Sequence, residues 1–105
     1  MIDHVMRFNL PAATAKLAEL ARVAGIPGTA AAAPEAAANA FVEWLARMKQ
    51  ELGIPAQLSG LATGRTLGAS DIPALVEVAT NDICHRTNPR PCTREDFAAL
   101  FAAAL

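Results

Sequence analysis

The stretch TNPRPCTREDFAALFAAAL, residues 87–105, combines a rigid proline-rich turn with an amphipathic helix. Thr93 and Asp96 stand three residues apart, which is close to a capping box, in which each side chain bonds the backbone N–H of the other residue. We therefore expect a helix that opens at Thr93. Apolar residues recur at helical spacing after it and form the expected buried stripe, which consists of Phe97, Leu100, Phe101 and Ala104.

The helix before this turn must end before Asn88-Pro89, because the residue that precedes a proline avoids the α region. Ser70 or Asp71 is expected to cap its start. Its core face is expected to contain Ile72, Leu75, Val76, Ala79 and Ile83. Residues 56–70, upstream of it, include three glycines. The residues expected to pack there as short helical turns are Leu58, Leu61 and Leu67.

Proline and glycine mark the limits of two more helices. One is predicted to carry Pro11 in its first turn, where the missing N–H costs nothing, and to end at Gly25. Its expected inner stripe is Leu17, Leu20, Ala21 and Ala24. The other is predicted to run from Pro34 to Gly53. Its expected seam is Phe41, Leu45, Met48 and Leu52, widened by Trp44.

These patterns predict an all-α fold, a compact array of about four helices that forms a single domain over residues 1–105. Alanine, the best helix former, dominates the composition, and little of the sequence alternates with the period of a strand. The short connections favour antiparallel neighbours.

The composition limits the classes of partner. Hydrophobic residues make up 53% of the 105 residues and mean hydropathy is +0.28, which predicts a surface covered by self-association or by another chain. The net charge of −1, without a basic stripe, argues against nucleic acid. The longest uncharged runs contain glycine and proline and are too short to span a bilayer, and the N-terminus lacks the features of a signal peptide. No membrane partner and a cytoplasmic location are therefore expected.

Few residues could carry chemistry. The glycine-rich motifs GxGxxG and GxxxxGK(S/T), which bind nucleotides, are both absent, so no nucleotide site is predicted. A metal site needs three or four ligands. Two groups of candidate ligands lack this number, namely Asp3-His4 and the set of Cys84, His85 and Cys92, whose spacing also fits no zinc pattern. We therefore assign no catalytic, cofactor-binding or metal-ligating residue. The two cysteines are not expected to form a structural disulfide.

Cys84 and His85 leave a second interpretation open, that of a small cysteine-dependent enzyme. Neighbours on a helix point about 100° apart, however, which places His85 poorly to activate Cys84. The alternative makes Cys84 a small apolar residue at a helix end and His85 a favourable charge near the negative pole of the helix. Arg90, fixed between two prolines, is expected to pair with a carboxylate or to anchor a neighbouring domain.

Several segments together resemble a known family. They are HVMRFN at residues 4–9, Gly53-Ile54-Pro55 followed by Leu58, Ser70-Asp71-Ile72, and DICHRTNPRP at residues 82–91 followed by a cap and Glu95-Asp96. Their order resembles the C-terminal helical domain of the iron-containing (group III) alcohol dehydrogenases, which have a dehydroquinate synthase-like fold. The resemblance covers nearly the whole chain.

The resemblance implies a two-domain parent whose N-terminal α/β domain binds NAD(P). Its helical domain holds Fe(II) or another divalent metal with one aspartate and three histidines. The last of these histidines lies upstream of the HVMRFN segment, so neither His4 nor His85 inherits a metal role. Met1-Ile2-Asp3 reads like a new start, and we expect a truncated C-terminal fragment that holds no cofactor and is inactive alone.

The resemblance also implies that Cys84 and His85 are wall residues of the substrate cleft. The expected partner is a second copy of the chain, as a homo-oligomer, or a complementary N-terminal half. The alternative is a standalone helical module for interaction or oligomerisation that has lost the chemistry.

Overall fold

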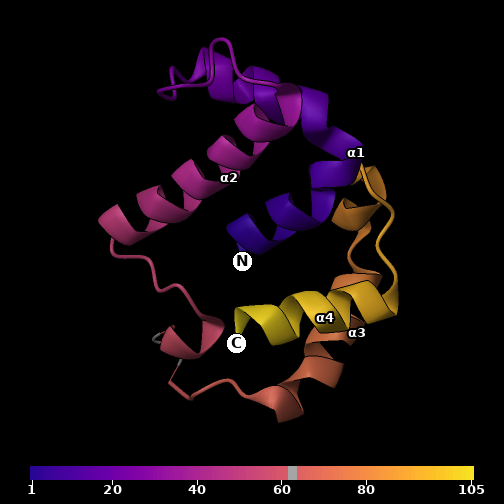
Figure 1. The fold of residues 1–105 in the computed structure, drawn as a ribbon. Helices are drawn as coiled ribbons and strands as arrows, with labels where there is room; N and C mark the ends of the chain where they lie inside the picture. Colours follow the sequence, from indigo (N-terminus) through magenta and orange to yellow (C-terminus); the bar gives the residue numbers. More distant parts are fainter. Residues whose placement is uncertain (62–63) are drawn as a thin grey trace.

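The computed structural model describes residues 1–61 and 64–105 (Figure 1). These residues form α-helices and short 3-10 helices and contain no strand, which confirms the all-α prediction. The elements in chain order are α1 (Ile2–Val23), α2 (Pro34–Glu51), η1 (Leu58–Gly60), η2 (Ala69–Asp71), α3 (Ile72–Asn81), η3 (Ile83–Thr87) and α4 (Arg94–Ala104). Within the described ranges, no helix is both long enough and apolar enough to cross a membrane.

The predicted start of α1 is wrong, because the helix begins at Ile2 and contains Pro11 in its interior. Proline has no N–H to donate to the carbonyl of Arg7, and its ring crowds that carbonyl. Figure 1 shows α1 changing direction part-way along its length, as expected for an internal proline. The Arg90 guanidinium donates to the neighbouring Phe8 carbonyl at 3.1 Å. A contact from the far end of the chain thus supports the backbone where proline weakens it.

The predicted glycine stops of α1 and α2 are confirmed. Gly25 and Gly53 have φ angles of 67° and 68°, a left-handed conformation that costs glycine little. At each end the glycine N–H and the N–H of the following isoleucine bond carbonyls of the last turn, as in a Schellman motif. The two helices therefore end by the same local mechanism, and the residues that form it are neighbours in the sequence.

The main core lies between α1 and α2, which contact each other most extensively. Its cluster of buried residues consists of Leu17, Ala18, Ala21, Ile26, Ala37 and Ala38. Val42 and Leu45 continue the buried face of α2. The predicted seams were partly wrong, since Leu20 is 44% exposed, Leu52 is 67% exposed and Ala24 is also exposed. Alanines face the partner helix instead, because small side chains allow closer approach of the two helices.

The second helical pair, α3 and α4, is less buried. The capping box at the start of α4 is confirmed: Asp96 N–H donates to Thr93 Oγ1 at 3.1 Å and Thr93 N–H to Asp96 Oδ2 at 2.9 Å. Of the predicted stripe only Ala104 is fully buried, and Phe97, Leu100 and Phe101 are half-buried. This pair therefore has little interior of its own.

The end of α3 differs from the prediction. The helix stops at Asn81, because Asp82 is extended and its carboxylate accepts from Cys84 N–H at 2.8 Å, which starts η3. Ile83 consequently leaves the core face and is 67% exposed. The Asp71 side chain does not cap α3 either, and accepts instead from Gly68 N–H at 2.9 Å.

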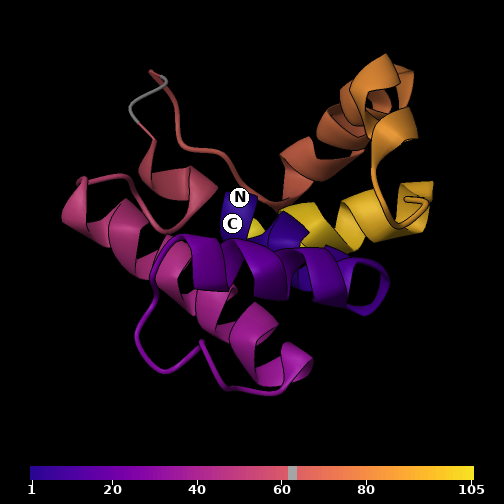
Figure 2. The same ribbon diagram turned by 90° about the horizontal axis from the view of Figure 1, so that it is seen from above.

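The molecule is flatter than the predicted compact array. Its dimensions are 45 × 30 × 18 Å, so its shortest axis is less than half of its longest. Its radius of gyration is 15.1 Å, against about 13 Å for a compact domain of this length. Figures 1 and 2 show the α1–α2 pair and the α3–α4 pair as two separate bodies joined along a limited boundary.

Candidate functional site

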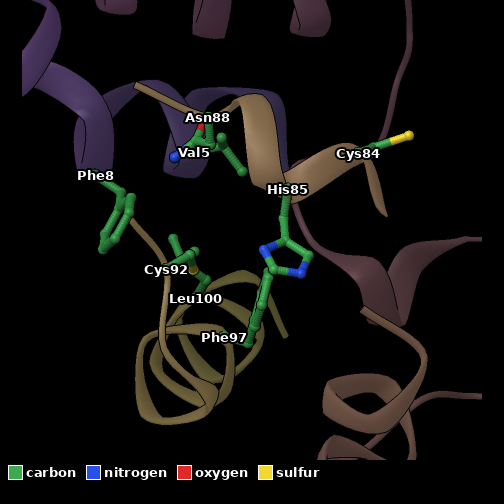
Figure 3. A pocket seen from close by; sticks show the side chains of 8 residues that line it. All are labelled: Val5, Phe8, Cys84, His85, Asn88, Cys92, Phe97 and Leu100. Atoms are coloured by element: carbon green, nitrogen blue, oxygen red, sulfur yellow. The ribbon is translucent and has the colours of Figure 1, made fainter. Parts of the chain in front are cut away.

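The candidate site is a cavity of about 160 Å³ at the boundary between the two helical pairs (Figure 3). It lies between the N-terminal half of α1, η3 and α4. Its lining residues are Val5, Phe8, Cys84, His85, Asn88, Cys92, Phe97 and Leu100. The walls are mainly apolar, with an imidazole, an amide and two thiols as the polar groups. A predominantly apolar pocket with few polar groups is the common form of a small-molecule site.

His85 lies in a wall of this cavity and is half-buried. Its Nε2 lies 3.2 Å from the Thr80 carbonyl oxygen, and its ring meets Phe97 edge-on with 5.5 Å between the ring centroids. Two contacts thus fix the plane of the ring. Figure 3 shows the imidazole turned into the cavity. The contact of His85 with a substrate remains a prediction.

Cys84 borders the same cavity but is exposed, and Figure 3 shows its sulfur directed away from the cavity. The adjacent Asp82 carboxylate, through a hydrogen bond and its negative charge, raises the pKa of the Cys84 thiol. Cys92, which the sequence analysis did not assign to the wall, is half-buried, and burial followed by the Asp96 charge raises its thiol pKa. Both cysteines are free thiols. Neither environment is that of an activated nucleophile.

We predict that Cys84 reacts more slowly with a maleimide than free cysteine does at pH 8, despite its exposure. A raised pKa means a smaller thiolate fraction at any pH below it, and only the thiolate is nucleophilic. Asp82→Asn keeps an acceptor for Cys84 N–H but removes the charge, so the reaction should accelerate. Mass spectrometry of the cysteine-containing peptide measures the rate. A rate equal to that of free cysteine and unchanged by Asp82→Asn would contradict the raised pKa, and only a rate above it would support a cysteine-dependent enzyme.

Asn9 and Asn88 join the two helical pairs next to the cavity. Asn9 Nδ2 donates to Asn88 Oδ1 at 2.8 Å and Asn88 Nδ2 donates to Asn9 Oδ1 at 2.7 Å. Asn88 Nδ2 also donates to the Arg90 carbonyl at 2.6 Å, which ties the amide to its own turn. Asn9 is only 4% exposed. We call this reciprocal contact the amide pair.

Arg90 strengthens the same boundary. Its guanidinium carbon lies 3.9 Å from the centroid of the Phe8 ring, a cation–π geometry, in addition to its bond with the Phe8 carbonyl. No carboxylate in the described part of the chain forms an ion pair with Arg90, and the alternative, that Arg90 anchors a neighbouring domain, stays a prediction. The HVMRFN and NPR segments, noted separately in the sequence, are therefore contact partners, and this contact forms one wall of the cavity.

The donor atoms of the described residues do not fit a divalent metal. Among these residues no three His, Cys, Asp or Glu side chains gather into a group. Asp3 is engaged by Lys49, whose Nζ lies 2.6 Å from Oδ1 and whose side chain is 8% exposed. Burial of the Asp3 carboxyl raises its pKa, but the Lys49 hydrogen bond and the nearby positive charges outweigh burial and lower the pKa to about 2. The carboxylate is therefore committed to joining α1 and α2.

A family model and individual relatives match this chain. All 105 residues match the model of the "Fe-containing alcohol dehydrogenase family, C-terminal". Lactaldehyde reductase of Escherichia coli is 35% identical over 104 residues, which are 99% of this chain and 26% of the reductase. The 1-propanol dehydrogenase of Salmonella typhimurium is 35% identical over 107 residues, covering 100% of this chain and 29% of that protein.

The fold matches as well. A crystal structure of 1,3-propanediol oxidoreductase superposes with a TM-score of 0.87 at 29% identity, over 99% of this chain and 26% of the other chain. This chain thus spans about a quarter of the length of the relatives it matches.

Proposed function

This chain belongs to the Fe-containing alcohol dehydrogenase family, and from this premise we propose that it serves as the C-terminal helical part of an iron- and NAD(P)-dependent alcohol oxidoreductase. The observation that carries the proposal is that the whole chain matches about a quarter of the length of its relatives, both in sequence and in fold. Lactaldehyde and 1-propanol, in the names of two relatives, support a short alcohol or aldehyde as the substrate. Hydride transfer would then take place in the longer protein.

Within that protein, the proposed role of this chain is to complete the substrate cleft. His85 supports this role because its ring is held in the wall of an apolar cavity. Cys84 contributes its backbone to the same wall, with its sulfur directed outward. The described residues gather no group of metal ligands, and we propose that other parts of the enzyme hold the iron and the nicotinamide.

The exposed apolar surface of this chain is also part of the proposal. The accessible surface is 6498 Å², whereas about 5,600 Å² is typical of a compact monomer of this mass. The excess is comparable to one side of a standard interface, roughly 800 Å². Large apolar side chains are exposed on several elements, among them Val23, Leu52 and Val78. We propose that the N-terminal part of the enzyme covers this surface.

The expected result for the isolated chain is no catalysis. We would incubate it with Fe(II) or Zn(II), NAD+ or NADP+, and methanol, ethanol or 1-propanol, and follow formation of the reduced nucleotide by absorbance. The 1-propanol dehydrogenase relative provides the positive control under the same conditions. Nucleotide reduction that rises and falls with the added metal would overturn the proposal that the chain is inactive alone.

The alternative is a standalone oligomerisation module, which the excess exposed surface equally favours. Sedimentation at micromolar concentration separates the possibilities. A closed oligomer that hides the apolar surface from a hydrophobic dye favours the module, whereas dye binding that disappears on addition of an N-terminal enzyme half favours the dehydrogenase. A sharp monomer without dye binding argues against any missing partner. The upstream reading frame gives a second test, since a nucleotide-binding domain encoded there favours the enzyme.

A further inference from the structure

We propose that the cavity between α1, η3 and α4 binds a ring-sized apolar molecule that carries one hydroxyl group, with Nδ1 of His85 accepting the hydrogen bond from that hydroxyl. The inference deepens the proposed role of His85 in the cleft wall and rests on that function to this extent. The site itself is formed entirely by side chains of this chain.

The size and the lining set the apolar part of the ligand. A cavity of about 150 Å³ lined by apolar side chains accommodates benzene, and this cavity measures about 160 Å³. The rings of Phe8 and Phe97, with Val5 and Leu100, supply most of its walls (Figure 3). Such walls cannot satisfy several polar groups on a ligand, and each unsatisfied group would cost binding energy. The ligand is therefore expected to be mainly apolar.

His85 sets the polar part. The Thr80 carbonyl can only accept a hydrogen bond, so its 3.2 Å contact with Nε2 assigns the proton of the neutral imidazole to Nε2. Nδ1 then carries a lone pair and acts as an acceptor. No described residue donates to Nδ1. Figure 3 shows one ring nitrogen turned across the cavity, towards Phe8 and Cys92, while the other faces away.

The other polar groups of the wall are already engaged. Both N–H bonds of the Asn88 amide are used, one by Asn9 and one by the Arg90 carbonyl, and its oxygen accepts from Asn9. The Cys92 sulfur lies 3.9 Å from the Thr93 carbonyl oxygen, its own acceptor. Nδ1 of His85 is therefore the acceptor of the wall that receives no hydrogen bond from the described residues, and a single hydroxyl is the donor that matches it.

The two cysteines provide a built-in assay. Cys92 lines the cavity and is half-buried, whereas the Cys84 sulfur points away from it. We would modify the full chain with a maleimide at pH 8, without metal or nucleotide, and measure both rates by mass spectrometry in the presence of phenol or toluene. These molecules have nearly the same size, and only phenol has a donor. Both should slow Cys92 in a saturable manner and leave Cys84 unchanged.

The hydrogen bond should lower the dissociation constant of phenol about fivefold relative to the same cavity without the acceptor, as expected for one neutral hydrogen bond. His85→Phe keeps an aromatic ring against Phe97 but removes the acceptor and leaves the phenol hydroxyl without a partner, so the affinity of phenol relative to toluene should fall about fivefold while toluene binding persists. Leu100→Trp fills the cavity and should abolish protection by both molecules without changing His85.

A ratio of phenol to toluene affinity that is unchanged in His85→Phe would overturn the proposal, as would protection of both cysteines alike. Should His85→Phe fail to fold, His85→Leu, which also lacks the acceptor, provides the same comparison. The assay contains neither metal nor nucleotide, so its failure leaves the proposed function standing. Metal-dependent turnover by the chain alone would overturn the proposed function without affecting this result.

Discussion

Leu17→Ala is expected to lower the free energy of unfolding by about 3 kcal/mol, within the range of about 2–5 kcal/mol for removing a buried leucine side chain. Leu17 is 4% exposed and lies in a core cluster that is otherwise largely alanine. Alanine side chains cannot move in to fill the space, so the cavity left behind adds to the lost burial. A domain of this size is stable by only about 5–15 kcal/mol, so the variant loses a large share of the total.

Urea denaturation followed by circular dichroism measures the effect, with an unchanged slope showing that the change is one of stability. Leu52→Ala is the matched control, because it is the same substitution at the end of α2, where the side chain is 67% exposed. Its effect should stay within about 0.5 kcal/mol. Leu17→Met, which nearly conserves volume, should cost less than about 1.5 kcal/mol. Similar losses in Leu17→Ala and Leu52→Ala would show that the core does not lie between α1 and α2.

The parts of the fold that the sequence predicted correctly are those determined by neighbouring residues. The stops at Gly25 and Gly53, the start at Pro34 and the capping box at Thr93 all use groups within a few positions of one another. Each is a local solution to unpaired backbone groups at a helix end, so its residue types are visible in the sequence. The all-α class follows from the same signals.

The errors arise where distant or competing contacts decide. Pro11 is typical of a helix start, but it lies inside the longer helix α1, where Arg90 bonds the nearby Phe8 carbonyl. Asp82 ends α3 early by capping η3. Helical spacing alone does not show whether a helix continues or a new cap forms at such a residue. Some large apolar residues of the predicted seams, such as Leu20, are exposed, and alanines are buried in their place, because periodicity gives the face of a helix only approximately.

The candidate site was predicted only in part for the same reason. His85 was identified through the family resemblance, and the structure places it in the cavity wall. The other six wall residues were missed, because the cavity forms between segments about 80 residues apart; they are Val5, Phe8, Asn88, Cys92, Phe97 and Leu100. The HVMRFN and NPR segments were the available signal. Their contact, and not either segment alone, is what creates the site.

Asn9→Ala is expected to separate the two helical pairs, with a loss of about 2–3 kcal/mol from a broken reciprocal contact and a part-buried Asn88 amide left without its partner. The loss should be uneven across the molecule. The α1–α2 pair has its own core, whereas α4 contacts α1 over a small area and depends on the amide pair and Arg90. Hydrogen exchange should therefore accelerate throughout α3 and α4 and change little in the centre of α2.

Asn39→Ala is the matched control, because Asn39 is an exposed helical asparagine whose amide bonds only the Glu35 carbonyl of its own helix. It should change exchange nowhere beyond α2. The double variant Asn9→Ala with Asn88→Ala should lose less than the sum of the single variants, since each single change already removes the same contact. Cys92 modification should also accelerate in Asn9→Ala, because the cavity it lines lies at the boundary that opens, while Cys84 should be unaffected. Uniform acceleration over all four α-helices, with additive losses, would show that the amide pair is not what joins the two pairs.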